Sequence, residues 1–269
     1  MTTTTPAAAG FRRRPLAALT KAEYLQFRRN KTLVYVATVF PISIPVALFF
    51  FARRGDAPAA DIAVLTFEML ALVTLLFVQY YSVLSMVTTR RGEGVLKRLR
   101  TGEAADWQIQ AAPAVPGALV TLACTVVVAV FVYGMGAPAP VNPVALLLAL
   151  VGGIVLFSVL ALATSAVTKN AEAAQITSLP VMTIAMLGLA SIRGFLPDRI
   201  TDLADWTPFA AISDLVSLGV AGKTAAASDT ALDFAGTFAE LGRPFATLAI
   251  WTVLAFALTR RSFRWDDRG

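Results

Sequence analysis

The sequence has 269 residues, of which 57% are hydrophobic and only 15% are charged. Because a soluble domain carries roughly 25% charged residues, this composition indicates a membrane protein. The net charge of +6 comes from basic residues that lie beside apolar runs, which favours a role in membrane topology over nucleic-acid binding. Because histidine is absent and the single cysteine, Cys124, lies in an apolar run, we expect no disulfide, metal site, catalytic residue or enzyme activity.

Two segments precede the first long apolar run. Residues 1–10 are small and polar, so we expect them to be disordered. Thr20 and Glu23 have the spacing of a capping box, and residues 16–27 give a rough apolar side among basic residues. We therefore predict a short helix in the membrane interface, with an ordinary solvated helix as the alternative. Residues 1–31 form this N-terminal region, and residues 32–269 are expected to form one transmembrane domain.

Six apolar segments follow, and they predict an all-α integral membrane protein with six transmembrane helices. At 1.5 Å per residue, about twenty residues cover the roughly 30 Å hydrocarbon core. Prolines in the first and fifth segments are expected to kink or interrupt those helices. The predicted spans are residues 32–51, 62–87, 113–133, 143–168, 173–192 and 244–259.

A further apolar run, residues 208–222, is ambiguous. It is fifteen residues long and has Asp214 in its middle. Runs this short are more often interfacial or re-entrant than spanning. We therefore predict external short helices between the fifth and sixth spans, with a seventh span as the alternative.

The distribution of basic residues predicts the orientation of the bundle, because lysine and arginine mark cytoplasmic loops. Seven basic residues precede the first span, five lie within residues 90–103, and four follow residue 259. The long loop after the fifth span instead has seven acidic and four basic residues. Both termini are therefore expected in the cytoplasm, and only Arg53 and Arg54 oppose this bias.

The densest charge lies in RRGEGVLKRLRTGE, residues 90–103, after the second predicted span. Its apolar residues share one helical side: Val95, Leu96 and Leu99. Its central basic residues point elsewhere: Lys97, Arg98 and Arg100. We predict a short helix across the cytoplasmic end of the bundle, with its two leucines facing outward as a docking surface. The alternative is a solvated loop whose charge only fixes topology.

The order of these features resembles the permease subunit of ABC-2 type exporters. Besides residues 90–103, VTKNAEAAQITSLP at 167–180 and GFLPDRITDLADWTPFAAISD at 194–214 are similar to segments of that family. The overall style is similar to permeases of daunorubicin-type antibiotic exporters. Thr101-Gly102 stands where the family often has Thr-Pro, so the helix end differs. The resemblance implies that the chain couples to an ATPase through Gly94, Leu96, Lys97, Arg98, Leu99 and Arg100.

The same resemblance implies ATP-driven export of a hydrophobic or amphipathic drug, antibiotic or lipid-like metabolite across the bacterial inner membrane. The sequence has no GxxxxGKS/T phosphate loop, so we expect ATP and Mg²⁺ on a separate ABC-type nucleotide-binding subunit and no cofactor on this chain. Six spans are half of a usual exporter core, which implies a homodimer or a closely related partner. Ala149 and Gly153 have the small-xxx-small spacing that lets helices approach closely.

Glu68 is the clearest carboxyl within an apolar run, and Gln79 lies two to three turns further along the same segment. An ionisable group inside the membrane is a functional hypothesis by default, so we treat the two as a possible polar site on one face. The alternative is a hydrated carboxylate near the interface. An ion-coupled secondary transporter, which would need several such groups and repeat symmetry, and a non-transporting scaffold are the rival functions.

Overall fold

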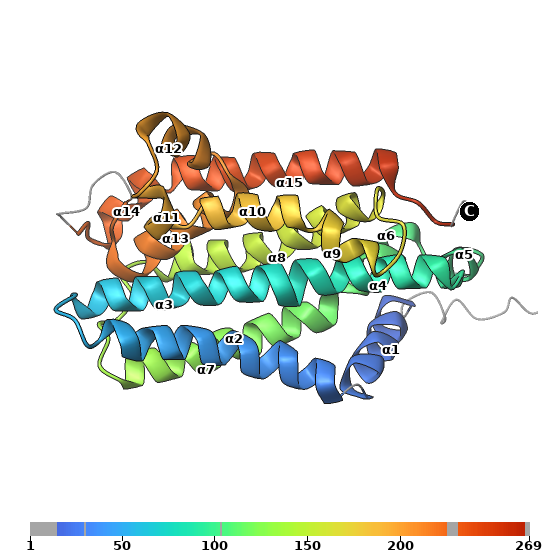
Figure 1. Ribbon diagram of the computed structural model, residues 1–269, viewed down its shortest axis with the longest axis horizontal. Coiled ribbons are helices and arrows are strands. Elements are labelled where there is room, and N and C mark those ends of the chain that lie inside the picture. Colours follow the sequence, from blue (N-terminus) through green and yellow to red (C-terminus); the bar gives the residue numbers. More distant parts are fainter. Residues whose placement is uncertain (1–14, 30, 103, 225–230, 267–269) are drawn as a thin grey trace, which may run out of the picture.

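The computed structural model describes residues 15–29, 31–102, 104–224 and 231–266, and all regular structure in these ranges is helical. Residues 1–10, for which disorder is expected, lie outside the described residues. Five helices are long and apolar enough to cross a membrane, and they run side by side along the longest axis (Figure 1). They are Val34–Ala52, Ala59–Gly92, Ala114–Gly134, Pro143–Ser165 and Gly242–Ser262. The prediction of an all-helical membrane protein is therefore confirmed.

The second of these long helices is continuous over 34 residues, Ala59–Gly92. It consists of α3 (Ala59–Val73), a π-helical stretch η2 (Thr74–Tyr81) and α4 (Ser82–Gly92). At 1.5 Å per residue its length is about 50 Å, so it extends beyond a hydrocarbon core of roughly 30 Å. The start of the charged segment, which sequence analysis assigned to a loop, therefore belongs to this helix.

The predicted fifth span does not form one long helix. Residues 173–193 instead form three short helices, α9 (Ala173–Thr177), α10 (Leu179–Leu187) and α11 (Ala190–Arg193). Pro180 lies in the first turn of α10, where its missing N–H breaks no intrahelical hydrogen bond, so the helix restarts there. Five helices of spanning length are therefore present among the described residues, and the interrupted segment stands where the fifth of the six spans was predicted.

The ambiguous run forms α13 (Pro208–Ala221), a helix of 14 residues. Twelve of these residues are buried, and the helix packs against α3, α8 (Pro143–Ser165) and α15 (Gly242–Ser262). A helix of about 21 Å is too short to cross the hydrocarbon core. The burial also contradicts a position on the membrane surface, since α13 fills the space between three long helices.

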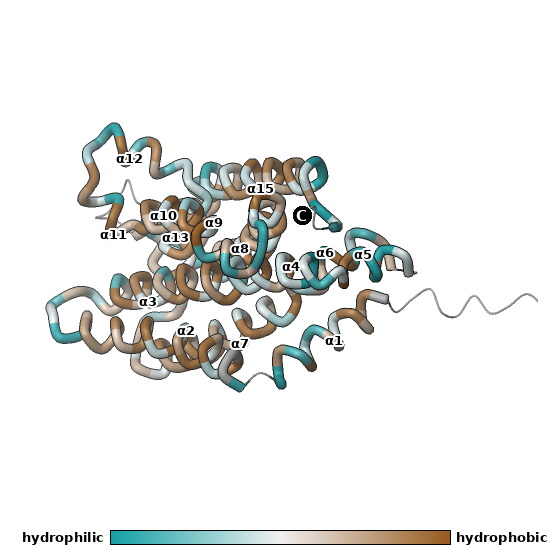
Figure 2. Tube along the Cα trace, turned by 45° about the vertical axis from the view of Figure 1, so that its right-hand side comes forward, coloured by the Kyte–Doolittle hydropathy of each residue, from teal (hydrophilic) through white to brown (hydrophobic). Residues whose placement is uncertain are grey.

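The remaining helices separate into two ends of the molecule. α1 (Pro15–Arg29), α5 (Val95–Arg100), α6 (Asp106–Ala111) and the C-terminal segment lie at one end, here called the α5 end (Figure 1). α11, α12 (Asp198–Ala204) and α14 (Phe234–Glu240) lie at the other, here called the distal end. Hydrophilic residues gather at these two ends, and hydrophobic residues dominate the long helices between them (Figure 2).

The long helices also present apolar side chains outward. On α2 (Lys31–Ala52) and α7 (Ala114–Gly134), Phe51 and Val130 are each 70% exposed. Large exposed apolar surfaces are rare on soluble monomers and are expected where acyl chains take the place of water. The bundle therefore has a lipid-facing surface around its long axis.

Candidate functional site

At the α5 end, a left-handed glycine joins α4 to α5. Gly94 has φ +69°, a conformation that residues with a Cβ rarely adopt, and it lets the chain turn sharply between the two helices. The turn directs Leu96 into the core of the bundle, where its side chain is only 1% exposed, and Leu99 packs against the same core. The prediction that both leucines face outward is therefore wrong, because this side of the helix faces the bundle.

The basic side of α5 remains accessible. Lys97, Arg98 and Arg100 are exposed. Arg100 contacts two other segments of the chain, since it lies 3.4 Å from the carboxylate of Asp106 and its guanidinium lies 4.8 Å from the ring centre of Trp265. Arg98 donates to the carbonyl of Glu93 at 3.3 Å. The outward surface of α5 is thus cationic, with apolar anchoring on its other side.

Two arginines at the end of α4 connect α5 to the rest of the bundle. Arg90 forms an ion pair with Glu23 of α1, and Glu23 is only 2% exposed. Glu23 is therefore not a capping residue, and Thr20 lies inside α1 rather than before its first turn. Because charged pairs of this kind are directional, the contact fixes α1 against α4.

Arg91 makes the second connection, and sequence reasoning missed it. Its side chain is buried and donates to the carbonyls of Ser165 at 2.7 Å, Lys169 at 3.2 Å and Thr168. These carbonyls belong to the end of α8 and the turn after it, where helices leave unsatisfied acceptors and favour a positive charge. The turn between α8 and α9 is thus held directly by the helix that carries α5.

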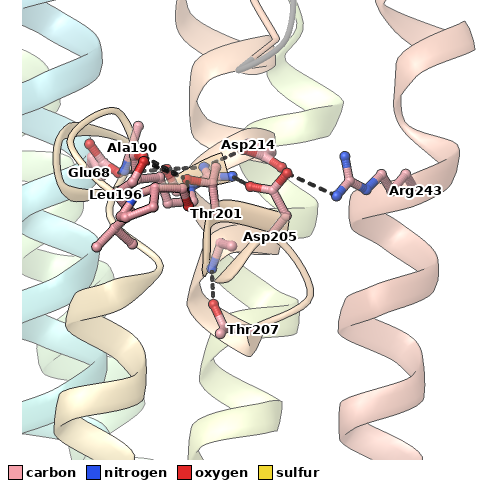
Figure 3. Close-up of polar contacts among 12 residues, drawn as sticks. Glu68, Ala190, Leu196, Thr201, Asp205, Thr207, Asp214 and Arg243 are labelled. Atoms are coloured by element: carbon pink, nitrogen blue, oxygen red, sulfur yellow. Dashed lines mark hydrogen bonds and ion pairs between the residues drawn. The ribbon is translucent and has the colours of Figure 1, made fainter. Parts of the chain in front are cut away.

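A second group of polar side chains lies at the distal end (Figure 3). Glu68 of α3 is 2% exposed, and one of its carboxylate oxygens accepts from the backbone N–H of Ala190 at 2.6 Å and from the hydroxyl of Ser213 at 2.5 Å. Glu68 is therefore enclosed by protein donors, and the alternative of a hydrated carboxylate is wrong. It links the long α3–η2–α4 helix to α11 and to α13.

Arg193 lies at the centre of this group, and sequence reasoning missed it too. Its guanidinium, 4% exposed, lies 2.7 Å from the carboxylate of Asp205 and 2.5 Å from that of Asp214. Burial opposes the charge of Arg193, but the carboxylates of Asp214 and Asp205 outweigh it and raise the pKa of the guanidinium. Arg243 of α15 lies 3.1 Å from Asp205. We call these residues the distal cluster: Glu68, Arg193, Asp205, Ser213, Asp214 and Arg243.

Gln79 does not belong to the distal cluster. Its amide donates to the carbonyl of Ala114 at 3.1 Å and to the hydroxyl of Ser158 at 2.6 Å, so it joins η2 to α7 and α8. The prediction that Glu68 and Gln79 share a face is wrong, since the two side chains contact different helices. The π-helical stretch that begins after Glu68 and contains Gln79 has i→i+5 hydrogen bonds, which change the rotation per residue.

The small residues of the fourth predicted span serve contacts within the chain. A Cβ added at Gly153 would lie 2.7 Å from a methyl of Leu75 and 3.3 Å from a methyl of Ile212. Ala149, one turn away, is 3% exposed. α8 therefore uses this pair to approach η2 and α13 closely.

A family model described as ABC-2 type transporter matches residues 14–192, which include α1, the α3–η2–α4 helix, α5 and the turn held by Arg91. The chain belongs to the ABC-2 type transporter family. It is therefore the membrane permease component of an ABC transporter, a multi-pass protein of a kind that pairs with an ABC nucleotide-binding subunit.

The family match ends one residue before Arg193, so most of the distal cluster lies outside the matched range. A search among curated proteins finds no match to this ABC-2 permease.

Proposed function

We propose that this ABC-2 permease is the transmembrane subunit of an ATP-driven exporter in the bacterial inner membrane. It works as a homodimer with a separate ATPase subunit that holds ATP and Mg²⁺. Its substrate is a hydrophobic or amphipathic molecule, such as a drug, an antibiotic or a lipid-like metabolite, as in permeases of the daunorubicin type.

This proposal rests on how α5 is held at the α5 end, with one side anchored in the bundle and the other side exposed. Leu96 holds α5 in the core while Lys97 and Arg98 face outward, so a partner can contact the cationic side without unfolding the helix. Arg90 and Arg91, in the last turn of α4 just before α5, connect α4 to α1 and to the end of α8. A displacement of α5 by an ATPase would therefore move several long helices together.

The charge distribution supports the orientation. The α5 end carries the basic side chains of α5 and lies beside both the N-terminal helix and the C-terminal segment (Figure 1). Because basic residues are retained in the cytoplasm, this end faces the cytoplasm in the proposed exporter, together with both termini. Substrate then leaves toward the distal end.

Reversing the outward charge of α5 tests the coupling role. The double variant Lys97→Glu/Arg98→Glu should weaken co-purification of the cognate ATPase at least tenfold, because we propose that the cationic side of α5 contacts an acidic surface of the ATPase, which the introduced carboxylates would repel. Arg54→Glu is the matched control, because it reverses an exposed charge in the loop between α2 and α3, which lies at the distal end (Figure 1), and it should leave capture unchanged.

Membrane abundance and thermal stability of each variant would be measured in parallel. Undiminished ATPase capture by a folded Lys97→Glu/Arg98→Glu variant would refute the coupling surface. Substrate transport that persists without any ATPase would instead favour an ion-coupled carrier.

A further inference from the structure

A recess of about 430 Å³ lies at the α5 end, between α5 and residues 263–266 of the C-terminal segment. Three of its six lining residues are cations, two are aromatic and one is a carboxylate: Lys97, Arg100, Arg264, Phe263, Trp265 and Asp266. Its volume falls within the roughly 300–1,000 Å³ that small-ligand sites occupy. The recess is therefore large enough to hold a polar headgroup.

Aromatic contacts hold the C-terminal wall of this recess in place. α15 ends at Ser262, and the backbone is extended at Phe263, so the chain leaves the helix there. The rings of Phe263 and Trp265 lie 4.9 Å apart, edge to face, and both pack against the core of the bundle. On the other wall, the guanidinium of Arg100 lies 4.8 Å from the ring centre of Trp265. The two walls are therefore joined to each other.

Two cations of the recess are accessible to a ligand. Lys97 and Arg264 are exposed, and neither forms an ion pair with any of the described residues. Arg100 already has the carboxylate of Asp106 at 3.4 Å, and Asp266 adds a negative charge to the lining. A net positive charge remains, and it comes from two side chains whose nitrogen atoms reach the solvent. Phosphate oxygens are preferred partners of such groups.

The recess lies at the depth of the lipid headgroups. α15 has 21 residues, so it is about 31 Å long and matches a hydrocarbon core of roughly 30 Å. Leu254 and Leu258 of α15 are 56% and 55% exposed, as expected of a helix that faces lipid. The last turn of α15 adds Arg260 and Arg261, both exposed. Basic residues gathered just beyond the end of a membrane-crossing helix attract anionic lipids.

We propose that this recess binds the phosphate headgroup of an anionic phospholipid, with Lys97 and Arg264 as the phosphate ligands and the acyl chains along α15. The continuity of the recess with the exposed apolar side of α15 favours a lipid over an acidic segment of a protein partner. This assignment concerns the permease alone and does not rest on the exporter function.

The test compares phosphatidylglycerol with phosphatidylcholine of the same acyl chains, because the two lipids differ in net charge. Binding of each lipid to the full-length permease in a nonionic detergent is measured by native mass spectrometry. We expect one saturable phosphatidylglycerol site that becomes about 25-fold weaker in Arg264→Glu. One charge beside an anionic headgroup changes the affinity roughly fivefold, and the reversal changes two. Phosphatidylcholine should bind wild type and Arg264→Glu alike.

Two further variants separate the recess from its surroundings. Arg261→Glu makes the same charge change at the same end of α15 but does not line the recess, so it should weaken phosphatidylglycerol binding less than about threefold. Asp266→Asn removes the carboxylate from the lining and should strengthen this binding about fivefold. A folding defect cannot produce such a gain, so this variant keeps the test decisive.

Equal losses in Arg264→Glu and Arg261→Glu, without a gain in Asp266→Asn, would overturn the assignment, because the basic residues then attract lipid without a defined site. The proposal also falls if glycerophosphoglycerol, the headgroup without acyl chains, binds as tightly as the lipid, because the ligand is then a soluble phosphate. Unchanged lipid binding by an Arg264→Glu variant that loses ATPase capture would instead assign the recess to the ATPase. No ATPase is present in the lipid measurements, so their failure leaves the exporter function untouched.

Discussion

Arg193 shows how one buried cation can hold the distal end together. It sits between two carboxylates on different segments, and its own exposure is 4%. Removing one partner of a buried ion pair leaves uncompensated charge and costs about 3–5 kcal/mol. The cluster is therefore expected to depend on Arg193 more than on any surface arginine nearby.

We predict that Arg193→Ala strongly destabilises the distal end, because Asp205 and Asp214 are left close together without their shared cation. Thermal unfolding of the purified permease should show a large fall in midpoint. Arg199→Ala, in the exposed part of α12, is the control and should change the midpoint little. Similar losses in the two variants would show that the buried ion pairs do not determine stability.

Glu68 offers a way to separate hydrogen bonding from charge. Glu68→Gln keeps an acceptor oxygen for Ala190 and Ser213, so we expect near-normal folding and transport. Glu68→Leu leaves both donors buried and unpaired, at a cost of about 1–3 kcal/mol each. Midpoints of thermal unfolding, with transport by the ATPase complex, would distinguish the variants. Loss of transport in a stable Glu68→Gln variant would indicate that the ionised carboxylate itself is needed.

For single residues, the sequence predicted which side chains share one side of a helix, but it did not predict what those side chains contact. The leucines of α5 share one side as predicted, but periodicity does not say whether that side faces a partner or the bundle. Arg193 and Arg91 could not be assigned because their partners are up to 78 residues away along the chain. Their common signal is a basic residue at the end of an apolar run, and for Arg91 the retention of basic residues in the cytoplasm explains this signal equally well.

Among the elements, the α4–α5 turn depends on Gly94. A Cβ at this position would meet no atom within 4 Å, so substitution changes only the backbone preference. Left-handed backbone costs a residue with a Cβ about 1–2 kcal/mol.

We therefore predict that Gly94→Ala weakens ATPase capture through misplacement of α5, while insertion into the membrane stays normal. Gly134→Ala is the control, because it too has open space around a Cβ but does not have positive φ. Co-purification and membrane abundance would be compared for both. Full ATPase capture by Gly94→Ala would show that the turn tolerates the substitution without moving α5.

The long helices were predictable, and so was the interruption of the fifth predicted span at Pro180, but the other irregular features were not. Apolar length alone indicates where a chain can cross the bilayer, and five predicted spans lie within or close to α2, α3–η2–α4, α7, α8 and α15. The π-helical stretch and the burial of α13 depend on neighbours that sequence periodicity does not describe.

For the whole molecule, the sharpest prediction concerns sidedness. Reporter fusions at the C-terminus and after Gly102 should read cytoplasmic, and a reporter inserted at Arg199 of α12 should read external, because the basic residues favour retention of the α5 end. A site at Ala225 would serve the same purpose but lies outside the described residues. A cytoplasmic signal from Arg199 would contradict the proposed orientation.

The continuous helix from Ala59 to Gly92 has a mechanical consequence for such a transporter. Glu68 and Arg91 stand on the same rod, so torque applied at α5 reaches the distal cluster through covalent structure rather than through a chain of contacts. The only irregular section of that rod is the eight-residue π-helix. In the proposed exporter, its torsional stiffness would determine how closely the distal cluster follows a rotation that the ATPase imposes at the α5 end.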